Sequence, residues 1–254
     1  MALTATVRER TAGRVVEIAT YTRIQRNDDP RVRAQKQKKT TEVMQKYNKK
    51  TSTQKFALKL AANFDVGDVV ACLTFRDECL PKSRAETSTR FRYCRNLLKR
   101  EWQRRDLDPE GLIFGWSIEH VHGEGRWHVH CVFTGTGEDY EMLRRCWIYG
   151  DILQCDALRV DSEKNYDTLA AYYAKEAREK LGLRSWSFSR NAKSPYEVCD
   201  RVDGDIEPEA PEGVVVIEKH VTETSFGKFC YLKYILPESP DRPRPHAKRK
   251  RAAA

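Results

Sequence analysis

The stretch that decides the fold is GRWHVHCVF, from Gly125 to Phe133. Apolar and β-branched residues dominate it, which predicts a buried strand, yet His128 and His130 interrupt the run. Successive side chains of a strand point to opposite faces, so both imidazoles share one face. The other face is apolar and consists of Trp127, Val129, Cys131 and Phe133. Because the chain has only six histidines, this pair is the first candidate for chemistry.

Further strands are expected on both sides of this stretch. GLIFGWSIEHV (residues 111–121) predicts a strand directly upstream, and HGEGR (122–126) is typical of the hairpin loop that would join the two. DVVACLTFRD (68–77) predicts a buried strand earlier in the chain, and DILQCDALRV (151–160) predicts one later.

Three helices are expected between and after these strands. Ser83 and Glu86 form an S-x-x-E capping box, and Phe91, Cys94, Leu98 and Trp102 follow at helical spacing. The other helices are expected in residues 139–150, closed by Gly150, and in residues 164–182. The order β, α, β, β, α, β, α predicts an α+β fold, in which a central antiparallel sheet of split βαβ type carries its helices on one face.

Charge and composition divide the chain into five segments. Residues 1–62 are expected to form a basic arm, because positions 1–60 hold fifteen Lys and Arg against five Asp and Glu. A main domain (63–200), an acidic proline-rich linker (201–213), late strands associated with the core (214–237) and a basic tail (238–254) follow.

The overall composition favours a polyanionic partner. The net charge of +9 suits nucleic acid. The chain contains no run of about twenty apolar residues, so we expect no membrane span, and we see no secretory signal. Its eight cysteines form no C-x-x-C pair, which argues against a zinc ribbon and favours a reduced, cytoplasmic setting.

The histidine pair predicts a metal site. Imidazoles at positions i and i+2 of a strand lie about 6–7 Å apart at Cα and can converge on one ion. Glu119 on the preceding strand is a candidate third ligand, and His120 and His122 are alternatives. A carboxylate ligand favours Mg²⁺ or Mn²⁺, which suits phosphate chemistry.

The helix expected over residues 164–182 contains two adjacent tyrosines. Leu169, Tyr173, Ala177 and Leu181 form a core-facing stripe, which turns Tyr172 away from the core. Lys175 lies three residues after Tyr172 on the same face. A nearby ammonium favours phenolate, so Tyr172 is a candidate nucleophile with Lys175 as its helper, although most helix tyrosines are packing residues.

Together these patterns resemble the HUH endonucleases. HVH in GRWHVHCVF resembles their motif of two histidines around a hydrophobic residue, YYAK resembles their Y-x-x-K motif, and ACLTF resembles their first motif. The resemblance covers roughly residues 66–196 and is nearest to rolling-circle replication initiators of phage and plasmid type with a single catalytic tyrosine.

The resemblance implies a role for each matching residue. His128, His130 and Glu119 would hold a divalent metal ion, Tyr172 would be the nucleophile and Lys175 the motif lysine. The implied reaction nicks single-stranded DNA or an extruded origin hairpin, forms a 5′-phosphotyrosine ester and can rejoin the strand.

The resemblance also implies partners. The free 3′-OH would prime a host polymerase working with the host helicase. Arg126, Arg76 and Arg190 are candidates for holding the DNA backbone, and Trp127 and Trp186 are candidates for stacking on bases.

Two alternatives remain open at the level of sequence. A relaxase or a single-tyrosine transposase would share the same motifs. A non-catalytic single-stranded DNA-binding protein would share the basic surface without depending on Tyr172.

Overall fold

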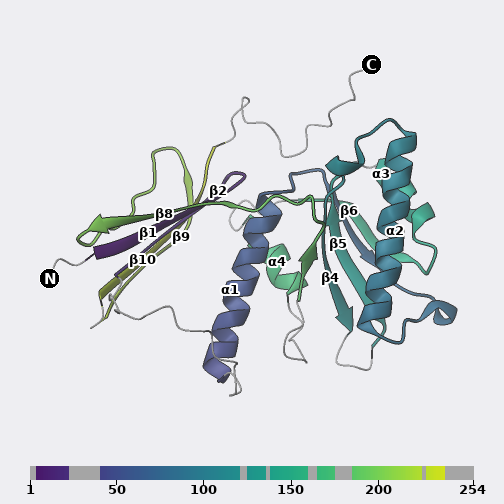
Figure 1. Cartoon of the computed structure of the whole chain (residues 1–254), viewed down its shortest axis with the longest axis horizontal. Coiled ribbons are helices and arrows are strands. Elements are labelled where there is room, and N and C mark those ends of the chain that lie inside the picture. The colour runs from purple at the N-terminus through teal and green to yellow at the C-terminus, as the bar shows by residue number, and fades with distance from the viewer. Residues whose placement is uncertain are drawn as a thin grey trace, which may run out of the picture. The chain divides into compact units, whose positions relative to one another are not determined.

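The structure is a computed structural model that describes residues 4–22, 41–120, 125–135, 138–159, 165–174, 185–224 and 227–237. These residues divide into two compact units. Among the described residues, the central unit runs from Lys59 to Lys193, and the terminal unit combines the residues up to Leu58 with residues 194–237. Each unit contains a five-stranded antiparallel sheet, and the fold is α+β (Figure 1). Helix α1 (Glu42–Ala61) continues from the terminal unit into the central one.

The sheet of the central unit has the strand order β6-β3-β5-β4-β7. Its strands are β3 (Val69–Leu73), β4 (Phe114–His120), β5 (Trp127–Phe133), β6 (Ile152–Ala157) and β7 (Ser187–Phe188). The pairing of β4 with β5 runs from Phe114 opposite Phe133 to His120 opposite Trp127, which confirms the antiparallel pair expected from the sequence.

One face of this sheet packs against α2 (Arg84–Arg104) and α3 (Glu138–Cys146). Helix α2 begins where the capping box predicted, since the Ser83 side chain accepts a hydrogen bond from the backbone N–H of Glu86 at 3.2 Å. The four apolar residues expected to face the core are buried: Phe91, Cys94, Leu98 and Trp102. They meet Val129, Cys131 and Phe133 of β5 in one cluster, as the alternation of β5 predicted.

Helix α4 (Asp167–Tyr173) lies on the opposite face of the sheet, which corrects the expectation that the helices share one face (Figure 1). Its Tyr172 and Tyr173 rings contact the ring of His130, which points away from α2 and α3. The physical reason is that β5 is buried on both sides. Val132, which alternates with the core-facing residues, is as inaccessible as they are, so a second layer must cover it.

Gly150 does not close α3, which ends earlier, at Cys146. Instead it allows a close approach between two segments. A Cβ at Gly150 would lie 2.2 Å from the backbone oxygen of Thr74, just beyond β3. The indole N–H of Trp147 donates to the same oxygen at 2.8 Å. The turn after α3 is therefore fixed against the end of β3, and position 150 must lack a side chain for the two segments to come this close.

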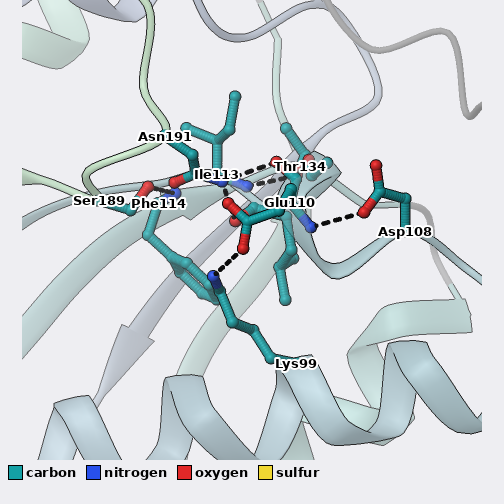
Figure 2. A network of polar contacts seen from close by, with 10 residues as sticks. Lys99, Asp108, Glu110, Ile113, Phe114, Thr134, Ser189 and Asn191 are labelled. Atoms are coloured by element: carbon teal, nitrogen blue, oxygen red, sulfur yellow. Dashed lines mark hydrogen bonds and ion pairs between the residues drawn. The ribbon is translucent and has the colours of Figure 1, made fainter.

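A polar network fixes the start of β4, as Figure 2 shows. The backbone N–H of Ile113 donates to the Thr134 hydroxyl at 2.9 Å, and that of Phe114 donates to the Ser189 hydroxyl at 3.0 Å. The Asn191 amide donates to the carbonyl of Leu112 at 3.1 Å. The segment after β7 is thus attached to the central sheet by hydrogen bonds to its backbone.

The terminal unit differs from the expected arm, linker and late strands. Its sheet has the order β8-β1-β2-β10-β9. The strands are β1 (Thr4–Ala12), β2 (Val15–Thr22), β8 (Tyr196–Asp203), β9 (Val215–Thr224) and β10 (Gly227–Ile235). Residues 4–22 are therefore a hairpin rather than part of a basic arm. The late strands, expected to associate with the core of the main domain, belong to this sheet instead, where β10 pairs with β2 and β9 pairs with β10.

The residues expected to form an acidic linker also pack against this sheet. Positions 201–203 belong to β8. Ala210 contacts the apolar cluster of Val16, Leu232 and Tyr234, as does Val214 directly after this segment. Glu207 pairs with Lys219 at 3.0 Å and with Lys228 at 3.2 Å. The acidic charge therefore neutralises lysines of β9 and β10, and the segment is a covering loop.

We predict that Gly150→Ala destabilises the fold, because the new methyl group overlaps backbone atoms that cannot move aside. The expected loss of unfolding free energy is about 1–3 kcal/mol. Gly111→Ala is the matched control, since its Cβ would meet only a Trp102 ring carbon at 3.6 Å, an ordinary contact. Urea unfolding of both variants is the measurement, and an equal effect of the two substitutions would contradict the role assigned to Gly150.

Candidate active site

The centre of the candidate site is a hydrogen bond between two buried side chains. Nε2 of His130 and Oε2 of Glu119 lie 2.5 Å apart, and both residues are less than 10% exposed. Glu119 is near the end of β4 and His130 is in the middle of β5. Polar groups buried this deeply are stable only when they are paired, so each side chain stabilises the other in this position.

His128 belongs to the same face of the sheet. It is directly opposite Glu119 in the β4–β5 register, and opposite residues of an antiparallel pair point to the same side. Its ring centroid is 6.5 Å from that of His130, with the planes inclined by 28°. His128 is partly exposed, whereas His130 is buried. The two imidazoles therefore share a face, as the strand alternation predicted, and the carboxylate of the candidate ligand Glu119 lies on the same face.

The two tyrosines of α4 lie beside this group in different environments. The ring of Tyr172 meets His130 edge-on, with centroids 5.4 Å apart, and 48% of Tyr172 is exposed. Tyr173 is buried, and its hydroxyl donates to the carbonyl of Cys131 at 3.2 Å. Burial raises the pKa of Tyr173 well above 10, and the nearby thiols of Cys131 and Cys72 raise it further. The helix phase inferred from the sequence is confirmed by these exposures.

Two small residues on this face were missed by the sequence analysis. Ser117 is opposite His130 on β4, and Cys72 is opposite His130 on β3. The Ser117 hydroxyl is buried and has no hydrogen-bond partner among the described residues. Ser117 could have been predicted from the alternation of β4, because it precedes Glu119 by two positions and therefore shares its face.

The arginines proposed to hold DNA separate into two groups. Arg126 donates to the carbonyl of Phe75 at 3.0 Å and pairs with Asp77, so it lies beside the Arg76 segment. Both are exposed, and both are at the end of the sheet where β5 begins, two residues before His128. Arg190 follows β7, which runs parallel to β5, and is therefore at the other end of the sheet. The structure does not bring Arg190 together with the other two.

The alternative ligand His120 is on the wrong face. It is opposite Trp127, and the two rings stack with centroids 4.1 Å apart on the side of the sheet that faces α2. Trp127 is partly buried and packs against the core cluster, so this stack lies on the core side of the sheet. Of the two candidate ligands on β4, Glu119 therefore faces the histidine pair and His120 does not. His122 and Lys175 lie outside the described residues.

The donors fit a divalent cation in kind, because two imidazoles and a carboxylate are ordinary ligands for such ions. In this structure, however, the three side chains are not arranged around a common point as the ligands of a metal ion would be. Among the residues that the structure describes, no group of three or more His, Cys, Asp or Glu side chains is arranged to hold a metal ion. In this structure Glu119 and His130 contact one another, so metal binding would require their hydrogen bond to open.

The chain matches no protein-family model, no curated protein and no solved structure. None of the helices that the structure describes is long and apolar enough to cross a membrane.

We predict that Tyr173→Phe lowers the free energy of unfolding by about 1 kcal/mol, because it leaves the buried Cys131 carbonyl without its donor. Tyr172→Phe is the matched control. It removes a hydroxyl from an exposed ring, and its expected effect is within about 0.5 kcal/mol. Urea unfolding at pH 7 measures both. A larger loss for Tyr172→Phe would contradict the assignment of Tyr173 as the packing residue.

The raised pKa of Tyr173 adds a pH dependence with a defined sign. Below about pH 10 the phenol is protonated in both the folded and the unfolded chain. As the pH rises further, the unfolded chain releases this proton while the folded chain retains it, so stability falls. Tyr173→Phe lacks this contribution. The difference in stability between the parent protein and Tyr173→Phe should therefore shrink between pH 9 and pH 11 in paired urea titrations.

Proposed function

We propose that this protein is a metal-dependent DNA strand transferase of the HUH type, which nicks single-stranded DNA and initiates rolling-circle replication. The observation that carries the proposal is the presence of Glu119, His128, His130 and Tyr172 on one face of one sheet. These residues come from two adjacent strands and a later helix. A carboxylate, two imidazoles and an accessible phenol are the groups that such a reaction needs.

Glu119, His128 and His130 would hold the metal ion, for which Mg²⁺ or Mn²⁺ suits the mixed oxygen and nitrogen donors. A bound divalent cation supplies charge that polarises a phosphoryl oxygen. The protein's own contribution is orientation. The β4–β5 pairing keeps Glu119 opposite His128, and the buried position of His130 restricts its ring.

Tyr172 is the proposed nucleophile. Its ring is half exposed, so a DNA strand can reach it, and it is next to His130. Tyr173 is unsuitable because its hydroxyl is buried and already donates to the Cys131 carbonyl. Its raised pKa also opposes formation of a phenolate. Lys175 remains the proposed helper from the resemblance.

The proposed step exchanges one phosphoester for another. The Tyr172 oxygen forms a bond to the scissile phosphorus, the bond from phosphorus to the 3′ oxygen breaks, and the proton lost by the phenol is balanced by the one gained by the 3′ oxygen. The products are a 5′-phosphotyrosine ester and a free 3′-OH. Attack of a 3′-OH on the ester reverses the step, so a strand can be rejoined without ATP.

The proposed substrate is single-stranded DNA or an extruded hairpin, since the backbone must leave the duplex to reach a tyrosine on this face. Arg76 and Arg126 are exposed at the His128 end of the sheet, and the net charge of +9 favours a polyanion. The free 3′-OH would prime a host polymerase in the cytoplasm, with a host helicase opening the duplex.

We predict that the protein forms a covalent adduct with a labelled hairpin oligonucleotide in the presence of Mn²⁺, visible on a denaturing gel. Tyr172→Phe should abolish the adduct while leaving oligonucleotide affinity within about twofold, because only the attacking oxygen is removed. Tyr173→Phe is the control and should retain the adduct. Binding without any adduct would identify a single-stranded DNA-binding protein and would contradict the proposed reaction.

A second prediction concerns the metal ion. EDTA should abolish the adduct, and added Mn²⁺ should restore it. His128→Ala and Glu119→Ala should each lower the rate of adduct formation at least about tenfold, as is usual when a group that stabilises transition-state charge is lost. His120→Ala is the matched control, because His120 faces the other side of the sheet. Equal losses for His120→Ala and His128→Ala would refute the proposed ligand set.

A further inference from the structure

Arg95 of α2 lies in an aromatic box outside the candidate active site. The carbon of its guanidinium is 4.1 Å from the ring centroid of Trp116, 5.2 Å from that of Phe91 and 5.9 Å from that of Phe114. Two of these rings belong to β4 and one to α2 itself. Ring faces attract a cation and fix the planar guanidinium in one orientation.

This cation has no counter-charge in the described part of the chain. The Arg95 Nε is buried without a hydrogen-bond partner, and no Asp or Glu side chain is within ion-pairing distance of the guanidinium. Lys99, one turn further along α2, shows the contrast, since it pairs with Glu110 at 3.3 Å (Figure 2). A partly buried charge without a counter-charge is unfavourable, and buried cations are usually paired.

A second arginine strengthens the positive charge at this place. Arg92 is one turn before Arg95, is exposed, and has no ion pair with any described residue. The pKa of Arg95 is lowered to about 10, chiefly by burial and to a smaller extent by the charge of Arg92. Arg95 is therefore still protonated at neutral pH. An anion bound between Arg92 and Arg95 would reduce the repulsion between their two positive charges.

We propose that Arg95, supported by the rings of Trp116, Phe91 and Phe114, binds a phosphate of single-stranded DNA outside the cleavage site. The Arg95 residue is partly exposed, so a ligand can reach it. A guanidinium that is already fixed on its rings presents its donors to a phosphate with little loss of side-chain entropy.

The identity of the ligand rests on the proposed function, and the position of the box fits it. The Trp116 ring contacts Arg95 on the side of β4 that faces α2. Ser117 and Glu119 of the same strand lie on the other side of the sheet, toward His130. Beyond β4 the sheet has only the two residues of β7. A DNA strand held at Arg95 would reach the histidine face by passing around this edge, to which residues 189–191 are also attached. The box is thus a second point of attachment for the strand being cut.

Binding and stability of Arg95→Met test the inference. The measurements use the full chain with Tyr172→Phe as background, so that no adduct forms. We expect Arg95→Met to lower affinity for a labelled 20-nucleotide oligonucleotide roughly tenfold, the usual value of a charge-assisted contact. The slope of log K against log salt should fall by about 0.7, which corresponds to one phosphate contact on a single strand. Arg95→Lys, which keeps the charge but loses the fork, should lose affinity to a smaller extent.

Arg100→Met is the matched control. Arg100 is exposed on the same helix and the substitution removes the same charge, so affinity should fall by less than about threefold. Melting temperatures separate a binding role from a packing role. Arg95→Met removes a partly buried charge that lacks a partner but also removes its ring contacts, and because these effects oppose one another, its melting temperature should stay close to that of the background protein. Equal affinities of Arg95→Met and the background protein, or a lowered melting temperature with unchanged affinity, would overturn the inference.

The two proposals fail in different ways. If the parent protein forms the covalent adduct and Arg95→Met changes neither affinity nor salt slope, the phosphate site is refuted and the nuclease stands. If no adduct forms but Arg95→Met still loses affinity and slope, the phosphate site stands and the nuclease is refuted. Inorganic phosphate at millimolar concentration should compete with the oligonucleotide for the parent protein more strongly than for Arg95→Met.

Discussion

The antiparallel pairing of β4 with β5 is the constraint on which the candidate site depends. It puts Glu119 opposite His128 and Ser117 opposite His130, and the hydrogen bond between the His130 imidazole and the Glu119 carboxylate crosses the pair diagonally. A slip of one residue in this register would turn every side chain of one strand to the other face. The apolar cluster on the α2 side prevents such a slip, because Phe114 and Ile118 must remain buried there. The polar group is therefore positioned by the packing of the opposite face.

Local patterns in the sequence predicted much of the central unit. The alternation in GRWHVHCVF assigned both faces of β5, and the helical spacing after Ser83 assigned the buried side of α2. The phase of the helix expected over residues 164–182 distinguished the exposed Tyr172 from the buried Tyr173. Each of these features is set by a period of two or 3.6 residues, so neighbouring residues carry enough information to predict it.

Features set by distant residues were not predicted. The face on which α4 lies depends on which surface of the sheet remains uncovered, and no local pattern records that. The hairpin of β1 and β2 was overlooked because Arg8, Glu9 and Arg10 hide the alternation of β1, although VVEIATYT after Gly13 shows it. Gly13, with a φ of 57°, supplies the backbone conformation that the two-residue turn requires. The lack of an acidic partner for Arg95 was also not predicted, because it depends on which side chains the fold brings near the guanidinium.

The antiparallel sheet of the terminal unit has a consequence for the order of folding. β1 and β2 find their outer partners only in β8 and β10, and the whole central unit lies between them along the chain. The described part of the central unit, Lys59–Lys193, is one stretch of chain and can condense once its residues have left the ribosome. The β1–β2 hairpin must wait for its partners: the edge of β1 stays unpaired until β8 is made, and the edge of β2 until β10 is made. Long loop closure makes such a sheet slow to assemble. During synthesis the first hairpin is therefore the part of the chain most exposed to pairing with other molecules.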